Sequence, residues 1–144
     1  MMMIWRFIVA GLLLWPLEAA AVELRPITVV TGTAGLMHVP VEVTNTGDVA
    51  MACTLQLAHW YSMSLGTTPP GETSVMDLWF DPLSATYLAL NGKQENMPVE
   101  AAWCGLAGRA YETRAEIALQ RHAGKNPAAA KVACAADGGR LVCK

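Results

Sequence analysis

Residues 39–57, with the sequence VPVEVTNTGDVAMACTLQL, decide the fold of this chain. In the first half, valines alternate with other residues: Val39, Val41 and Val43 against Pro40, Glu42 and Thr44. In the second half, Cys53, Leu55 and Leu57 alternate with Thr54 and Gln56, and residues 45–48 between the halves have turn composition. Because successive side chains of a strand point to opposite faces, this pattern predicts two half-buried strands joined by a turn, with Cys53 in the core. Pro40 has no backbone N–H and restricts the first strand to an edge or to an early position in its ladder.

Further strand-like stretches flank this pair. They are residues 27–33, residues 59–63 as a continuation of the second strand, and residues 75–80, 85–90, 97–104 and 111–119. Gly and Pro mark the turns, above all in residues 66–72, and Asn91-Gly92 is a pair typical of hairpins. About seven short strands with turn signals every 8 to 12 residues predict an all-β fold, an antiparallel β-sandwich.

The stretch 110–121 has two interpretations. Its apolar side is Tyr111, Thr113, Ala115, Ile117 and Leu119, which alternate with charged residues as in a strand. Alanine, glutamate, arginine and leucine also favour helix, and Tyr111, Ala115 and Leu119 share a helical face. We favour the strand, because the alternation separates every charge from every large apolar group.

Four cysteines, Cys53, Cys104, Cys134 and Cys143, form an even set that predicts two disulfides in an exported chain. Residues 131–143 (KVACAADGGRLVC) are typical of two short strands around a Gly138-Gly139 turn, which places Cys134 opposite Cys143. This pairing leaves Cys53 for Cys104. Zinc binding is the alternative, but no two cysteines have C-x-x-C spacing and no His completes a ligand set.

Residues 1–21 have the layout of a secretory signal peptide: Arg6, the apolar run 7–15, and Ala19 and Ala21 at the positions that signal peptidase requires. The apolar run is shorter than the roughly 20 residues that cross a bilayer, and an uncleaved anchor is the alternative. We therefore expect a periplasmic or secreted protein with no membrane span after cleavage. Residues 22–122 are predicted to form the sandwich, and residues 123–144 a linker and the disulfide-closed hairpin, which either docks on the sandwich or stands free.

The pattern Val41-x-Val43-x-Asn45-x-Gly47, followed by an apolar strand and later by Pro70-Gly71-Glu72, resembles the early strands of immunoglobulin-like and fibronectin-type modules of exported bacterial proteins. The resemblance covers about half of the predicted mature chain and implies a β-sandwich without implying a function. The chain departs from true immunoglobulin domains. Trp60 is nearer to Cys53 than their core tryptophan would be, and Ala102 stands where they place a tyrosine.

Composition and motifs argue against several functions. Only 15% of the residues are charged and the net charge is −2, so there is no electrostatic footprint for nucleic acid. The sequence has no G-x-S-x-G, S-x-x-K, H-E-x-x-H or Walker-type motif. We therefore expect no catalytic residues and no cofactor, and predict a non-catalytic binding or accessory protein whose partner is another exported or membrane protein. A small hydrolase or a hydrolase inhibitor is a further alternative.

Aromatic residues are the candidates for partner contact, because their rings offer a large contact area with a polar edge. They are Trp60, Tyr61 and Trp79. The competing interpretation is that one ring of each adjacent pair packs into the sandwich and the other covers an edge.

A copper-handling protein is another hypothesis, with methionine and histidine ligands at Met37, His38, His59 and Met63. On one strand, however, His59 and Met63 would lie about 13 Å apart, and methionine also serves as core filler.

Overall fold

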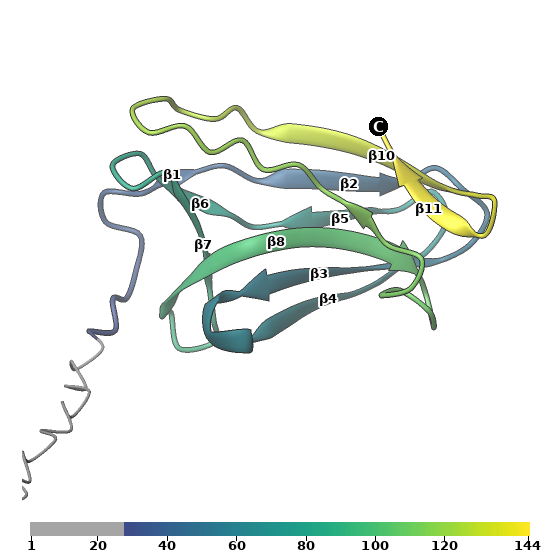
Figure 1. The fold of residues 1–144 in the computed structure, drawn as a ribbon, viewed down its shortest axis with the longest axis horizontal. Helices are drawn as coiled ribbons and strands as arrows, with labels where there is room; N and C mark the ends of the chain where they lie inside the picture. The colour runs from purple at the N-terminus through teal and green to yellow at the C-terminus, as the bar shows by residue number, and fades with distance from the viewer. Residues whose placement is uncertain (1–27) are drawn as a thin grey trace, which may run out of the picture.

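The structure, a computed structural model, describes residues 28–144, and both strands predicted from residues 39–57 are present in it (Figure 1). They are β2 (Val41–Asn45) and β3 (Met51–Leu57), and each buries every second residue, as its alternating sequence requires. Pro40 directly precedes β2, which confirms its predicted early position in the ladder. The predicted leader, residues 1–21, lies outside the described residues.

The strands form two sheets that share one hydrophobic core, so the predicted β-sandwich is confirmed. Sheet I has the order β1-β6-β7-β8-β3-β4, with β9 beside β8, and sheet II has the order β11-β10-β2-β5. The remaining strands of sheet I are β1 (Met37–His38), β4 (Ser62–Thr68), β6 (Trp79–Asp81), β7 (Thr86–Leu90), β8 (Asn96–Leu106) and β9 (Ala115–Glu116). Those of sheet II are β5 (Thr73–Met76), β10 (Ala130–Asp137) and β11 (Arg140–Cys143).

The chain passes between the sheets at several points. It leaves β1 for β2 through Val39 and Pro40, and leaves β5 for β6 through Asp77 and Leu78. The backbone N–H of Val39 donates to the carbonyl of Leu78, so the two crossings lie side by side. Residues 117–129 lead the chain from sheet I back to sheet II, where β10 lies beside β2. These two strands run parallel, while the other strand pairs are antiparallel.

Both predicted disulfides are present, Cys53–Cys104 between β3 and β8 and Cys134–Cys143 between β10 and β11. The register of the C-terminal hairpin is also as predicted, from Asp137 opposite Arg140 to Cys134 opposite Cys143. The hairpin is part of sheet II through β10, so it belongs to the sandwich and does not stand free. Two disulfides indicate an oxidising environment outside the cytoplasm.

Several predicted strands are wrong in extent. In the described part of 27–33, only Thr31 forms a β-bridge, to Glu95. Residues 75–80 are divided between β5 and β6, because Leu78 enters the core where the chain changes sheets.

Residues 110–121 form neither the expected long strand nor a helix. A turn occupies residues 107–113, and only β9 pairs with β8. The predicted inward face holds only in part: Thr113 and Ile117 are buried, but Tyr111 is exposed. Residues 28–144 contain eleven strands instead of the expected seven or so, because short strands such as β1 and β9 form only beside their tertiary neighbours. Within residues 28–144, no helix has the length and apolarity needed to cross a membrane.

Candidate functional site

Three connections of sheet I lie at one end of the sandwich, on the left in Figure 1: residues 58–61, 82–85 and 91–95. Together they hold every non-glycine residue with a positive φ in residues 28–144, namely His59 (61°), Trp60 (68°), Ala85 (55°) and Gln94 (61°). Such left-handed conformations cost roughly 1 to 2 kcal/mol for residues with a Cβ. At the opposite end, turns use glycine where φ is positive, as at Gly71, Gly108, Gly138 and Gly139. Backbone strain is thus concentrated at one end, a distribution typical of functional sites.

The connection between β3 and β4 displays Trp60. The side chain of Trp60 is 99% exposed and that of Tyr61 is 62% exposed. Residues 58–60 form a single 3-10 turn, and the hydrogen bond from the Leu57 N–H to the Tyr61 carbonyl joins the two residues that flank it. The expectation that residues 59–63 continue a strand, with one of the two rings packed inward, is therefore wrong. The chain reverses at Trp60 because left-handed residues end β3.

Trp79 lies elsewhere, on the outer face of sheet I. In the register of the sheet, its neighbours are His38 on β1 and Leu88 on β7, and Leu88 is followed by Pro98 on β8. The Trp79 ring stacks on His38 with their centroids 4.7 Å apart, and it is half-buried. The structure therefore separates Trp79 from the exposed Trp60 and Tyr61 and makes it part of an apolar row across the sheet.

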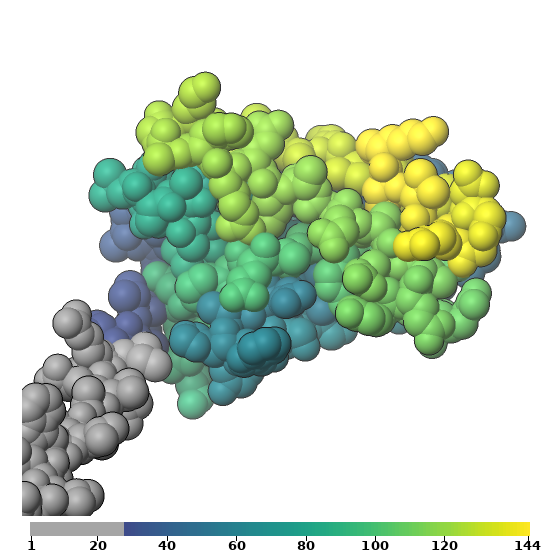
Figure 2. All heavy atoms as spheres, viewed as in Figure 1, coloured from purple at the N-terminus to yellow at the C-terminus, as the bar shows by residue number. Residues whose placement is uncertain are grey.

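A groove of about 680 Å³ lies on the outer face of β7, and we call it the outer groove. Four parts of the chain surround it: the N-terminal stretch 28–36, the β6–β7 turn, the start of β8, and His59. The larger apolar residues of its lining are Val29, Val30, Leu36, Leu83, Leu88, Met97 and Pro98. Leu83 is 91% exposed and projects from a turn, where a leucine buries nothing in the isolated protein. Figure 2 shows the dark blue N-terminal stretch beside the teal stretch that contains the β6–β7 turn.

Two carboxylates line the outer groove near the two ends of β7. Asp81 is opposite Thr86, the first residue of β7, and accepts hydrogen bonds from the Leu83 N–H (2.9 Å) and the Ser84 hydroxyl (2.7 Å). These bonds hold the pKa of Asp81 below its usual 3.8, and the bond from the Ser84 hydroxyl has the largest effect. Glu95 follows the far end of β7 and accepts a hydrogen bond from the Asn91 amide (2.5 Å).

A smaller hollow adjoins the outer groove and shares Glu95 and Met97 with it. Tyr61 and Met63 line this hollow, whereas His59 lines the outer groove. Trp60 therefore stands on the border between two concave surfaces.

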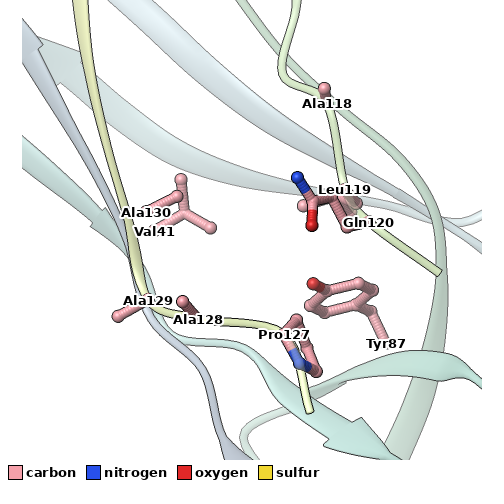
Figure 3. A pocket seen from close by; sticks show the side chains of 9 residues that line it. All are labelled: Val41, Tyr87, Ala118, Leu119, Gln120, Pro127, Ala128, Ala129 and Ala130. Carbon is pink, nitrogen blue, oxygen red and sulfur yellow. The ribbon is translucent and has the colours of Figure 1, made fainter. Parts of the chain in front are cut away.

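A third cavity, of about 230 Å³, lies between residues 118–120 and 127–130 (Figure 3). The Tyr87 hydroxyl and the Gln120 amide point toward its middle, and four of the nine residues in its lining are alanines. Burial raises the pKa of Tyr87, although the charge of Arg121 opposes the shift. At neutral pH the cavity therefore offers one hydroxyl and one amide, with no ionised side chain in its lining.

The four residues of the copper hypothesis do not come together. Met37 and His38 lie on β1 at one edge of sheet I, while Met63 lies on β4 at the other edge and His59 precedes it in a turn. The His38 Nε2 atom is paired with a carboxylate oxygen of Asp77. In the described part of the chain, no three His, Cys, Asp or Glu side chains gather as metal ligands would.

Sequence reasoning found the exposed aromatics but missed the outer groove. Its lining comes from segments as far apart as Val29 and Pro98, and no local periodicity brings them together. Leu83 carries the one available signal, because a leucine inside the Asp81-Pro82-Leu83-Ser84 turn is out of place in a solvated loop. Comparison of the chain with protein-family models, curated proteins and solved structures finds no match, so its function rests on the residues described above.

Proposed function

We propose that this chain is an exported, non-catalytic binding or accessory protein of the periplasm. It acts through protein–protein contacts at the end of the sandwich that carries Trp60 and the outer groove. The observation that carries the proposal is Trp60, a fully exposed tryptophan held on a left-handed backbone. Exposing this ring and straining its backbone both cost free energy in the isolated protein, and a partner that covers the ring would repay that cost.

The polar groups of the site support binding over catalysis. The carboxylate of Asp81 already accepts two turn hydrogen bonds, and that of Glu95 accepts one from Asn91. Carboxylates held in this way position loops and attract cations. A general base works best with a pKa near the working pH, whereas the pKa of Asp81 is held below its usual value. Tryptophan and tyrosine are among the residue types that dominate the energetics of protein interfaces.

Export supports a partner in the same compartment. The two disulfides require an oxidising environment, and the predicted leader directs the chain out of the cytoplasm. The partner is accordingly another exported protein or the exposed part of a membrane protein.

Photo-crosslinking in the producing cell tests this function. The photoreactive residue p-benzoylphenylalanine replaces Trp60 in one variant and Tyr111 in a control, because Tyr111 is also exposed (66%) but lies in the turn at the opposite end. We expect an ultraviolet-dependent adduct of defined mass from position 60 and none from position 111. Equal labelling at both positions, or no adduct at position 60, would overturn the proposed contact surface.

A further inference from the structure

The outer groove runs along β7, and the start of β8 forms the other side of its floor. Asp81 and Glu95 line the groove near the two ends of β7, and the five residues of β7 span roughly 16 Å at about 3.3 Å per residue, which sets the length of the floor. An extended segment of about five residues spans the same length, whereas a helix of that length rises only about 8 Å. Leu88 at the middle of β7 and Pro98 beside it make the centre of the floor apolar. The groove thus matches a short extended segment with apolar side chains in its middle.

The two ends of the groove are acidic. Asp81 is beside the first residue of β7 and Glu95 follows the last, so the carboxylates are separated by about the length of the floor. No lysine or arginine lines the groove. Within residues 28–144, ion pairs join only Lys131 to Glu42 and His38 to Asp77, so neither groove carboxylate has a cationic partner in the described chain.

We propose that the outer groove binds an extended segment of the partner protein that is apolar over about three residues and carries a lysine or arginine at each end. This inference rests on the proposed function and specifies the partner's chemistry at the same surface. The apolar residues cover Leu83 and Leu88, and the two basic side chains pair with Asp81 and Glu95. A second copy of this chain is disfavoured as occupant because the neighbouring turn that carries Trp60, residues 58–61, holds no lysine or arginine. An anionic lipid surface is disfavoured because the carboxylates repel it.

Selection from a phage library of random dodecapeptides tests this chemistry, with the purified, disulfide-bonded protein as bait. We expect enriched peptides to contain two basic residues four to six positions apart with Val, Leu or Ile between them, and to be depleted of Asp and Glu. An enriched pool without this pair of basic residues, or no enrichment at all, would overturn the inference. Two further results would overturn the inference, because another occupant would then use the groove. One is flotation of the protein with vesicles of phosphatidylcholine and phosphatidylglycerol. The other is a dimer of the protein that Leu83→Lys dissociates.

Charge variants show whether the selected peptide occupies the groove. Leu83→Lys places a positive charge at its rim, and Val75→Lys is the matched control, because Val75 is an exposed apolar residue of sheet II and the change in net charge is the same. For an enriched peptide labelled with fluorescein, we expect Leu83→Lys to raise the Kd at least tenfold and Val75→Lys to change it less than twofold. We expect Glu95→Gln to abolish the preference for a basic residue at one end of the peptide only. Equal effects of the two lysine variants would place the peptide elsewhere.

This experiment and the crosslinking experiment fail separately. If position 60 gives a crosslink but the enriched peptides lack basic residues, the proposed function would stand, and only the proposed peptide chemistry of the outer groove would be wrong. Enriched peptides that are basic and bind Leu83→Lys more weakly, together with no crosslink from position 60, would instead remove Trp60 from the contact surface.

Discussion

The side-chain amide of Asn45 donates a hydrogen bond of 3.0 Å to the backbone carbonyl of Thr68, which ties the end of β2 in sheet II to the end of β4 in sheet I. Asn45 is fully buried, and its amide also donates to the Val49 carbonyl at 2.9 Å. Its Oδ1 atom accepts from the Gly47 N–H at 3.1 Å. One polar side chain therefore closes the turn after β2 and joins the two layers.

We expect Asn45→Ala to lower the free energy of unfolding by roughly 2 to 4 kcal/mol, because the carbonyl groups of Val49 and Thr68 lose their hydrogen-bond donor. Asn91→Ala is the control: Asn91 closes an equivalent turn at the β7–β8 connection but is only half-buried. Urea unfolding followed by tryptophan fluorescence measures both. Losses of equal size would show that the burial of Asn45 adds nothing to its turn hydrogen bonds.

Gly105 on β8 leaves no room for a side chain. A Cβ at this position would overlap the backbone carbonyl of Ala110, in the turn packed against the strand. We expect Gly105→Ala to destabilise the fold by roughly 2 to 3 kcal/mol. Gly92→Ala meets no atom within 4 Å and serves as control, with an expected change near zero. A thermal melt that shows the two variants equally stable would contradict the close packing of this turn.

The strain at His59 and Trp60 predicts a trade between stability and contact. The double variant His59→Asn/Trp60→Gly installs the residue types that tolerate left-handed backbone, and we expect it to stabilise the fold by roughly 1 to 2 kcal/mol. Because it also removes the exposed ring, we expect it to lose the partner adduct, scored with the photoreactive residue at the neighbouring Tyr61. His59→Ala/Trp60→Ala removes the rings while keeping a Cβ on each residue, and should lose the adduct without the gain in stability.

The carboxyl of Asp81 should titrate below its usual pKa of 3.8. Since the Ser84 hydroxyl is the largest cause, we expect Ser84→Ala to raise the Asp81 pKa toward the usual value. A depressed pKa in the folded state contributes stability above the unfolded pKa, which is lost as the pH falls through the folded pKa. NMR titration of the carboxyl carbon measures the shift, with Ser74→Ala as control because Ser74 lies on β5 in the other sheet. An unchanged Asp81 pKa in Ser84→Ala would assign the shift to another donor.

The two disulfides should differ in their contribution to stability. Cys53 and Cys104 are 51 residues apart in the chain, whereas Cys134 and Cys143 are 9 apart. On the chain-entropy account, Cys53→Ala/Cys104→Ala should lower the free energy of unfolding by about 4 kcal/mol and Cys134→Ala/Cys143→Ala by about 3 kcal/mol. The first pair also leaves two alanines in the buried centre of the sandwich, which increases its loss. Denaturant midpoints of the two variants, compared at equal protein concentration, check the order.

Much of the architecture follows from local pattern. The alternation in residues 39–57 was sufficient to predict β2, β3 and the inward direction of Cys53, because side-chain alternation along a strand needs no knowledge of its neighbours. The Gly138-Gly139 turn was sufficient for the register of the C-terminal hairpin and its disulfide, since a two-residue turn sets which residues face each other. The second disulfide then followed by elimination.

Only the tertiary structure decided the rest. It divided residues 75–80 between two sheets, set β10 parallel to β2, and left residues 110–121 largely without regular structure. It also turned Trp60 outward and assembled the outer groove from segments between Val29 and Pro98. The physical reason is range. Alternation, turn residues and cysteine spacing act over a few neighbouring residues, whereas the choice of sheet and the shape of a groove depend on contacts between residues distant in the chain.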